Sequence, residues 1–306
     1  DRLRPFEVNK SHNISIMNSR FIGSEVLDGQ LSEDGFGTGY GLSVREGLDI
    51  TIEGNEFMRW SRGAIFSNIR NLTVRGNEVH SIRSDGMDFV RVRNVLIEGN
   101  HYHDFRRPAS SGDHPDMIQF WTNGTKSPSI DITIRGNILN SGLGGHTQSI
   151  FMRNEEVDTG RAGPEMFYRN IIIEDNIILN AHLHGITVGE TDGLIIRDNA
   201  VLHNALSDGE ADNPNLWMPR INVSAAARNV RIERNLTFGI SGHAGQGDWR
   251  LHHNYLVQDR TRARGGFYGM IFADPGGDPR DLTSFTYKEG GPLDGVEIGP
   301  SRLWRR

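Results

Sequence analysis

The sequence predicts an all-β chain that folds as a single-stranded, right-handed parallel β-helix of about 8–10 coils with loop insertions on one face. Two observations support this fold class. A short alternation of apolar and polar residues that ends in Asn recurs along most of the 306 residues, and a second short apolar alternation precedes the copies. Both have a period of two, which is typical of β-strands, and repeats this short bury an apolar face only by stacking.

The first alternation occurs in seven clear copies. They are Asp49–Asn55, Asn71–Asn77, Asn94–Asn100, Asp131–Asn137, Asn170–Asn176, Gly193–Asn199 and Asn229–Asn235, with a degenerate copy at Asn13–Ser19. We expect the final Asn of each copy to bond the next Asn along the axis, because a polar group buried in a bend needs a partner. A leucine-rich repeat has a similar length, but its regularly spaced leucines and its helical half are missing here.

The repeat spans most of the chain and therefore predicts one domain, residues 1–306. Residues 1–12 are expected to form an N-terminal cap region, 13–273 the coils, and 274–306 a C-terminal cap or tail. No apolar run is long enough to span a membrane, and the net charge of −6 argues against nucleic-acid binding. The absence of cysteine suits a secreted or periplasmic protein, or one on a cell or virion surface. The pattern leaves open whether the protein is a monomer or a trimer.

The second alternation precedes each Asn-marked strand. Its copies are Tyr40–Val44, Arg62–Phe66, Asp85–Phe89, Asp116–Phe120, Gln148–Met152, His184–Val188 and Pro219–Val223. The third and fifth positions are apolar and are expected to point inward, so the fourth should point to solvent. The first position is mostly polar, and we expect it to turn outward at the bend that begins the strand.

Stacking these copies brings polar residues into two columns. The first position contributes Tyr40, Arg62, Asp85, Asp116, Gln148 and His184, and the fourth contributes Ser43, Ile65, Asp88, Gln119, Phe151, Thr187 and Asn222. Stacked carboxylates repel one another and raise each other's pKa unless a cation or a shared proton relieves them. Insertions at 101–115, 155–168 and 206–218 lie beside the same strand. We therefore predict that this face carries the functional site.

The side chains of this face and its loops are the candidate site residues. The catalytic candidates are Asp85, Asp88, Asp113, His114, Asp116, His146 and His184. The candidates for substrate binding are Tyr40, Arg62, Arg83, Gln119, Trp121, Gln148, Arg153 and Asn222. A histidine can act as a base, and an arginine can neutralise the carboxylate of an acidic sugar. No cofactor is required by this arrangement, although Asp85, Asp88 and Asp116 could hold Ca²⁺.

Over roughly residues 10 to 275 the repeat resembles the carbohydrate-active right-handed β-helix families. These include pectate and alginate lyases, mannuronan C5-epimerases, polygalacturonase-like hydrolases and phage tailspikes. The segment Asp113-His114-Pro115-Asp116 is similar to a permuted form of the Asp-Pro-His-Asp/Glu motif of the epimerases. Segments 84–88 and 144–147 resemble the Asp-Gly and Gly-His-Gly elements of the hydrolases, without their adjacent Asp pair.

The resemblance implies a polysaccharide partner and three possible functions. The first is an enzyme that acts on an acidic, uronate-containing glycan by proton abstraction, as a lyase or C5-epimerase does. The second is a glycoside hydrolase with paired aspartates, for which Asp85 and Asp116 on neighbouring coils are candidates. The third is a non-catalytic glycan-binding protein of the tailspike or adhesin type. One fold hosts all three, so the fold alone does not choose between them.

Overall fold

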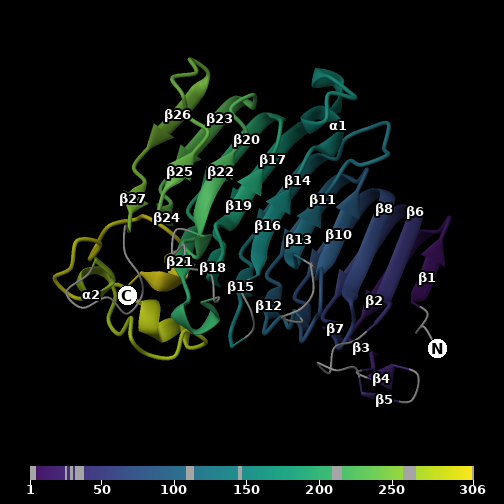
Figure 1. Ribbon diagram of the computed structural model, residues 1–306, viewed down its shortest axis with the longest axis horizontal. Helices are drawn as coiled ribbons and strands as arrows, with labels where there is room; N and C mark the ends of the chain where they lie inside the picture. The colour runs from purple at the N-terminus through teal and green to yellow at the C-terminus, as the bar shows by residue number, and fades with distance from the viewer. Residues whose placement is uncertain are drawn as a thin grey trace.

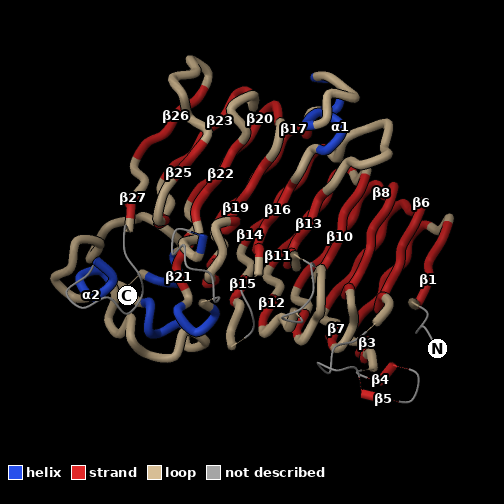
Figure 2. The backbone as a smooth tube through the Cα atoms, in the orientation of Figure 1, coloured by secondary structure: helices blue, strands red, loops and turns tan. Residues whose placement is uncertain are grey.

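The computed structural model describes residues 5–24, 26–27, 30–31, 38–107, 114–143, 147–208, 216–257 and 267–304. Within them the chain winds into a solenoid, and corresponding strands of neighbouring coils pair in parallel (Figures 1 and 2). Each coil passes through three rows of strands. We call these the first, second and third columns, in the order in which the chain passes through them.

The strands of the three columns have the following bounds. The first column contains β1 (Phe6–Asn9), the start of β6 (Tyr40–Glu53), the start of β8 (Arg62–Arg75), β10 (Met87–Val90), β13 (Asp116–Phe120), β16 (Gln148–Met152), β19 (His184–Val188), β22 (Arg220–Val223) and β25 (Ile240–Ser241). The second contains β2 (His12–Met17), the ends of β6 and β8, β11 (Arg93–Glu98), β14 (Ile130–Arg135), β17 (Tyr168–Glu174), β20 (Thr191–Arg197), β23 (Arg228–Glu233) and β26 (Trp249–His252). The third contains β3 (Arg20–Ile22), β7 (Glu56–Met58), β9 (Glu78–His80), β12 (His101–His103), β15 (Ile138–Asn140), β18 (Ile177–Asn180), β21 (Ala200–His203), β24 (Leu236–Thr237) and β27 (Tyr255–Leu256).

These columns confirm the predicted fold class and number of coils. The first two columns share a 16-stranded sheet, and the third is a nine-stranded sheet to which each of nine coils gives one strand. The other described elements lie in connections or beyond the last coil: the hairpin β4 (Val26–Leu27) and β5 (Gln30–Leu31), the helices α1 (Glu155–Asp158) and α2 (Phe267–Ile271), and the 3-10 helices η1 (Pro164–Met166), η2 (Ala205–Ser207), η4 (Leu282–Phe285) and η5 (Ser301–Leu303). No described helix is long and apolar enough to span a bilayer.

The core of the solenoid is made of inward side chains that stack from coil to coil. Phe66, Phe89 and Phe120 are in register on β8, β10 and β13 and are fully buried. Their rings stack with centroid distances of 5.1 and 4.8 Å. The same register aligns the predicted fourth-position column from Ser43 to Asn222. The predicted alignment of the fourth position is therefore confirmed, whereas at the first position of the last copy a register shift pairs His184 with Arg220 and not with Pro219.

The recurring asparagines form a buried ladder along the axis, as predicted. The Oδ1 atom of Asn137 accepts hydrogen bonds from the backbone N–H and the side-chain amide of Asn100, both at 2.9 Å. Asn137 in turn donates to Asn176, also at 2.9 Å. The pattern holds from Asn55 onward and continues one coil beyond the predicted copies, to Asn254. Because each Nδ2 also donates to a strand carbonyl, the polar groups of this bend are satisfied inside the solenoid.

A second row of Asn and Asp residues occupies the corner between the first and second columns. Asp49, Asn71 and Asn94 have φ values of 57°, 58° and 54°, a left-handed conformation that Asn and Asp tolerate better than most residues. The Asn71 amide donates to Asp49 at 2.6 Å, and the Asn94 amide donates to Asn71 at 2.9 Å. The repeat therefore begins and ends with Asn or Asp for two different reasons: backbone conformation at one corner, and buried hydrogen bonding at the other.

The two ends of the coiled region differ from the prediction. Residues 1–12 were expected to form a cap region, but β1 pairs in parallel with β6 and is an ordinary first-column strand. The coils were expected to reach residue 273, but the last described strand, β27, ends at Leu256. A strand that continues the ladder is more favourable than a separate cap, because it gives the backbone groups of β6 their partners.

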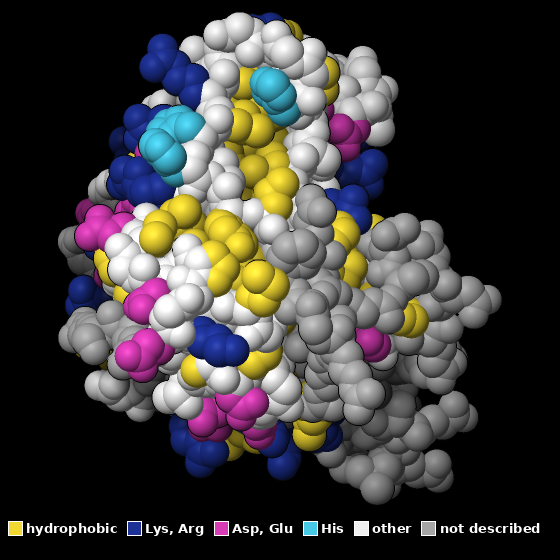
Figure 3. Space-filling model, turned by 90° about the vertical axis from the view of Figure 1, so that its left-hand side faces the viewer, with side chains coloured by type: hydrophobic (Ala, Val, Ile, Leu, Met, Phe, Trp, Pro, Cys, Tyr) yellow, Lys and Arg dark blue, Asp and Glu magenta, His cyan; other side chains and the backbone are white. Residues whose placement is uncertain are grey.

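The C-terminal tail packs against the side of the solenoid. Outward apolar residues of β18, β21 and β24 form a second core cluster with Tyr268, Phe272, Phe285 and Leu303 of the tail. Arg302 also donates to the carbonyl of Gly136, far from the last coil. Figure 3 looks onto the end of the solenoid and shows apolar side chains there, and Leu256 of β27 is 43% exposed. The described part of the tail therefore covers a flank of the third column and does not cap the last coil.

Candidate functional site

Three aspartates and one arginine meet where the first-column strands of three coils begin. The guanidinium of Arg62 donates to Asp88 Oδ2 at 3.0 Å and lies 3.1 Å from Asp85 Oδ2. Asp85 Oδ1 accepts from the backbone N–H of Asp116 at 3.2 Å, and Gln119 Nε2 donates to Asp116 Oδ2 at 2.6 Å. We call Arg62, Asp85, Asp88 and Asp116 the aspartate cluster. The sequence alignment correctly brought these four residues and Gln119 together.

The aspartate cluster is much more buried than the sequence indicated. Asp88 and Asp116 are fully buried and Asp85 is 3% exposed, although the alternation placed all three on the outer face. The physical reason is that neighbouring side chains cover them: Arg62 lies over Asp85 and Asp88, and Gln119 binds Asp116. The part of the cluster that reaches solvent is Arg62, whose side chain is 35% exposed.

Burial determines the protonation of the three carboxyls. Loss of hydration raises the pKa of Asp88 and Asp116 well above the usual range, and the charge of Asp85 raises both further. The pKa of Asp85 is also raised by burial, but Arg62 and the backbone N–H of Asp116 oppose that rise. Asp88 Oδ1 and Asp116 Oδ1 are buried without a hydrogen-bond partner. The cluster therefore favours protonated Asp88 and Asp116. In that state Asp85 alone, and not all three aspartates, balances the positive charge of Arg62.

Replacing Asp116 with Asn should stabilise the fold at neutral pH by about 1–3 kcal/mol, because the folded state no longer has to keep a buried carboxyl protonated. In the native protein the raised pKa of Asp116 makes the folded state bind more protons than the unfolded state. The free energy of unfolding that Asp116 takes away therefore grows as pH rises above about 4. The gain should therefore vanish below pH 4. Urea unfolding of both proteins at several pH values measures it.

A matched control for this change is Asp158→Asn. Asp158 is an exposed carboxylate that accepts from Arg153 at 2.9 Å, so the loss of its charge should change stability by less than about 1 kcal/mol and in the unfavourable direction. A loss of stability in the Asp116 variant at neutral pH would contradict the protonation that we assign to the cluster.

Tyr40 and His114 lie next to the aspartate cluster. Tyr40 is the register partner of Arg62 and is 36% exposed. His114 is exposed and lies close enough that a proton on its imidazole would lower the pKa of Asp85. Gln148 pairs with Asp116 in the ladder and is 7% exposed. Tyr40, Arg62 and His114 are thus the polar side chains through which the cluster meets solvent.

His184 and Asn222 form a separate group nearer the C-terminus. His184 Nδ1 lies 2.7 Å from Thr187 Oγ1, and the ring packs edge-on against Phe151 at 5.0 Å. The Asn222 amide also donates to Thr187 Oγ1, at 3.2 Å. Burial and the nearby His114 lower the pKa of His184 to about 4, so this imidazole is neutral at neutral pH. These residues line a pocket of about 330 Å³ together with Arg153.

The remaining predicted site residues differ in their surroundings. Arg153 is exposed and pairs with Asp158. Arg83 lies in the turn between β9 and β10, where its backbone N–H donates to Trp60. Trp121 directly follows β13 and is partly buried. Asp113 and His146 lie outside the residues that the structure describes, so their predicted roles stay predictions.

Ca²⁺ is poorly matched to the three aspartates in this conformation. The guanidinium of Arg62 already lies between Asp85 and Asp88, in the position that a cation would take. The three side chains also do not bring three carboxylate oxygens within 4.8 Å of one another. Calcium binding at this cluster therefore stays a prediction, and we build no chemical step on it.

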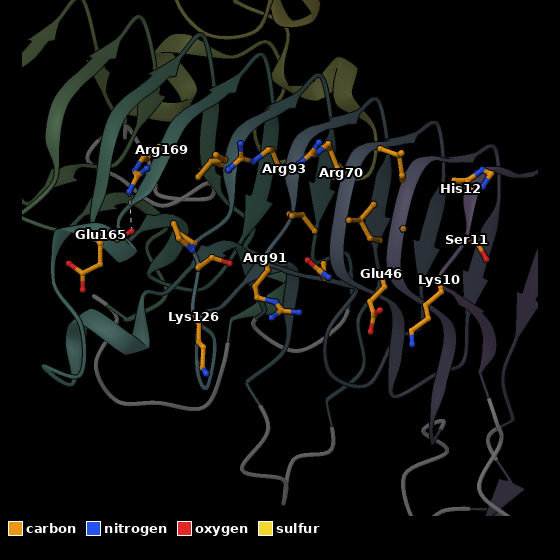
Figure 4. Close-up of a pocket in the computed structure, with 18 residues that line it drawn as sticks. Lys10, Ser11, His12, Glu46, Arg70, Arg91, Arg93, Lys126, Glu165 and Arg169 are labelled. Atoms are coloured by element: carbon orange, nitrogen blue, oxygen red, sulfur yellow. Dashed lines mark hydrogen bonds between the residues drawn. The ribbon is translucent and has the colours of Figure 1, made fainter.

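A second candidate site was not anticipated from the sequence. A groove of about 870 Å³ follows the corner between the first and second columns, and Figure 4 shows its charged side chains on successive coils. Its cations are Lys10, Arg70, Arg91, Arg93, Lys126 and Arg169, beside the acidic Glu46 and Glu165. Among the described residues, Arg70, Arg91 and Arg93 have no carboxylate within 4.0 Å. We call this surface the basic groove.

The basic groove has a signal in the sequence that lies outside the strand alternations. Arg70, Arg93 and Arg169 each directly precede the Asn that begins a second-column repeat. The ladder places Arg70 beside Arg93, and one further coil separates Arg93 from Arg169. Because neighbouring coils are about 4.8 Å apart, such residues form a row of positive charge along the axis.

Comparisons with known proteins find one family model and several solved structures that are similar to this chain. A family model described as "Right handed beta helix region" matches residues 6–113. The crystal structure of the periplasmic alginate epimerase AlgG is similar with a TM-score of 0.47 and 15% identity, over 71% of this chain and 47% of that one. A double mutant of AlgG gives a TM-score of 0.49 and 14% identity, over 79% and 50% of the two chains.

A mutant DFA-IIIase from Arthrobacter chlorophenolicus A6, in complex with DFA-III, gives a TM-score of 0.38 and 9% identity, over 71% of this chain and 44% of that one. This chain thus spans about half the length of the solved structures that it matches. No curated protein sequence matches the chain. The parallel columns show that the chain has a parallel β-helix fold, and the family model over residues 6–113 agrees with the right-handed form.

Proposed function

We propose that the protein processes an acidic, uronate-containing polysaccharide by removing the proton next to the uronate carboxylate, as a lyase or C5-epimerase does. The observation that carries the proposal is Arg62, whose guanidinium contacts the buried side chains of Asp85 and Asp88 while about a third of the Arg62 side chain faces solvent. A guanidinium fixed in this way can bind the substrate carboxylate and stabilise the negative charge that develops when the proton leaves.

In this proposal the neighbours of Arg62 move the protons. His114 accepts the proton from the sugar, and Tyr40 is placed to donate one, since both lie at the solvent side of the cluster. A lyase then breaks the bond to the neighbouring sugar and leaves a C=C bond. An epimerase returns a proton to the opposite face. Asp85 and Asp88 act as positioning residues, because they touch Arg62 and are covered by it.

The basic groove supports an anionic polymer as the substrate. Its row of cations follows the solenoid axis, and three of them lack a carboxylate partner among the described residues. The groove lies at the ends of the first-column strands, whereas the aspartate cluster lies at their starts. One sugar unit therefore cannot contact both sites, and the groove would hold another stretch of the chain. The lack of cysteine also suits our proposal that the protein is secreted or periplasmic.

Hydrolysis is the second candidate function. The raised pKa of Asp116 favours a carboxyl that keeps its proton, which a glycosidase needs in its general acid. The full burial of Asp116 opposes this role, because a general acid must reach the glycosidic oxygen. A sugar can bind at the partly exposed Arg62 and lose its proton there without any such opening of the structure. Proton abstraction is therefore the function that we favour.

A screen of acidic and neutral polysaccharides tests the proposal, with ultraviolet absorbance, a reducing-end assay and proton NMR as readouts, with and without chelator. We expect turnover of a uronate polymer, with either new absorbance from a C=C bond or inverted C5 signals by NMR. New reducing ends without absorbance would support hydrolysis instead. Binding without turnover would support a tailspike-like role, and a preference for neutral polymers would contradict the proposal.

A further inference from the structure

The outward face of the third column carries a group of histidine and glutamate side chains. His101 and His103 alternate with the buried Tyr102 on β12, so both imidazoles point away from the core. The ladder pairs His101 with Glu78 of β9. One ligand atom from each of Glu78, His101 and His103 lies within 4.8 Å of the other two. In the part of the chain that the structure describes, this is the only such trio.

Asp104 orients one of these imidazoles. Its Oδ2 atom lies 2.8 Å from His103 Nδ1, and its Oδ1 atom accepts from the backbone N–H of Leu143 at 3.1 Å. A fixed carboxylate next to Nδ1 holds the imidazole so that Nε2 faces Glu78 Oε1, 3.1 Å away. A proton shared by Nε2 and Glu78 satisfies this contact when no metal is bound, and a metal ion bound to both atoms would displace that proton. A carboxylate behind a histidine is also the usual outer shell of a metal ligand.

We propose that Glu78, His101 and His103 bind a first-row divalent transition metal such as Zn²⁺. Two imidazoles and one carboxylate suit zinc and its neighbours in the first transition row, whereas calcium and magnesium prefer all-oxygen sites. The ligands come from two adjacent coils, so the ion would tie β9 to β12. The side chain of Glu78 is 53% exposed, which leaves room for a water molecule as a further ligand.

His80 packs beside this site without contributing a ligand. Its ring stacks on His103 at 4.8 Å with an angle of 8° between the planes. Its Nε2 lies 3.2 Å from Glu56 Oε1, and its Nδ1 lies 3.2 Å from Ser81 Oγ. His80 therefore faces Glu56 and Ser81, and it is not part of the trio whose ligand atoms lie within 4.8 Å of one another. The site lies on a different column from the aspartate cluster, so this inference does not depend on the proposed polysaccharide chemistry.

The test is a titration of the chelator-treated full chain with Zn²⁺ by calorimetry, together with the absorption spectrum of the Co²⁺ complex. We expect one equivalent of metal per chain, a melting temperature that rises with metal concentration, and visible bands from Co²⁺ bound to nitrogen and oxygen ligands. His101→Gln and His103→Gln should each lower the affinity at least tenfold. Asp104→Asn should lower it about 10–100-fold at unchanged stoichiometry, because it only orients His103.

His252→Gln is the matched control. His252 is another surface imidazole, with Nε2 2.9 Å from Glu233 Oε2 and Nδ1 3.1 Å from a nitrogen of His253, but these described residues do not bring one ligand atom each within 4.8 Å of one another. This variant should bind zinc like the native chain. Absence of binding by the native chain would overturn the proposal. An equal loss of affinity in the His252 variant would also overturn it, and far-UV circular dichroism of each variant confirms that the fold persists.

Discussion

Replacing Arg62 with Lys should lower kcat on the acidic polysaccharide by about a hundredfold to a thousandfold and leave the fold intact. Lysine keeps the positive charge, but its single ammonium group cannot bridge Asp85 and Asp88 as the planar fork of Arg62 does. A charge displaced by even about 1 Å loses most of its effect on the developing negative charge. Steady-state kinetics on the polymer identified by the screen measure the loss.

Arg75→Lys is the matched control for Arg62→Lys. Arg75 lies at the end of the same strand, β8, and also binds a carboxylate, with Nη2 2.8 Å from Glu53 Oε2, but it is half exposed and remote from the cluster. Its replacement should leave kcat unchanged. An Arg62→Lys variant with native kcat would show that Arg62 only neutralises the buried aspartates. Addition of guanidinium to an Arg62→Ala variant should restore part of the activity if the group acts on the substrate.

Replacing Asn137 with Ala should lower the free energy of unfolding by about 3–5 kcal/mol, because it leaves several buried polar groups without partners. Asn137 is fully buried, accepts two hydrogen bonds from Asn100, and donates to Asn176 and to the carbonyl of Ile97. The side chain of alanine can replace none of these bonds. Denaturant unfolding measures the loss, and faster hydrogen exchange at the Asn100 amide locates it.

Asn71→Gly is the control for this loss. Asn71 belongs to the exposed row at the other corner, where it donates to Asp49 and accepts from Asn94. Glycine adopts its φ of 58° without strain, and water can replace both bonds, so the cost should stay below about 1 kcal/mol. Equal losses in the two variants would contradict the view that the buried ladder, more than the exposed one, stabilises the stack.

The sequence predicted the stack well because its signals are local and repeated. Asn77, Asn100 and Asn137 close similar strands, and one register places all of them in the ladder. The third column was missed because strands such as β12 are only three residues long, and so short an alternation is not recognisable as a pattern. The ends were misassigned for the related reason that β1 pairs with β6 but lacks the Asn signature.

The sequence predicted which residues form the candidate site, but it did not predict how deeply their side chains are buried. The alternation correctly grouped Asp85, Asp88 and Asp116, yet it could not show that the side chains of Arg62 and Gln119 would cover them. Side-chain cover depends on contacts across coils, which a periodic pattern does not contain. The basic groove was missed because the prediction used the aligned positions of the two alternations, whereas cations such as Arg70, Arg93 and Arg169 lie directly before copies of the first alternation, outside the aligned segments.

Because every rung of the asparagine ladder is alike, the number of coils can differ without a change in the aspartate cluster. Asn176 donates to Asn199, and Asn199 donates to Asn235, with the same atoms at nearly the same distances. Removal of residues 177–199 would therefore let Asn176 take the place of Asn199, and the coils that contain the aspartate cluster would be unaffected. The solenoid can shorten or lengthen in whole turns, so under the proposed function the stretch of polymer that it contacts could change while the aspartate cluster stays the same.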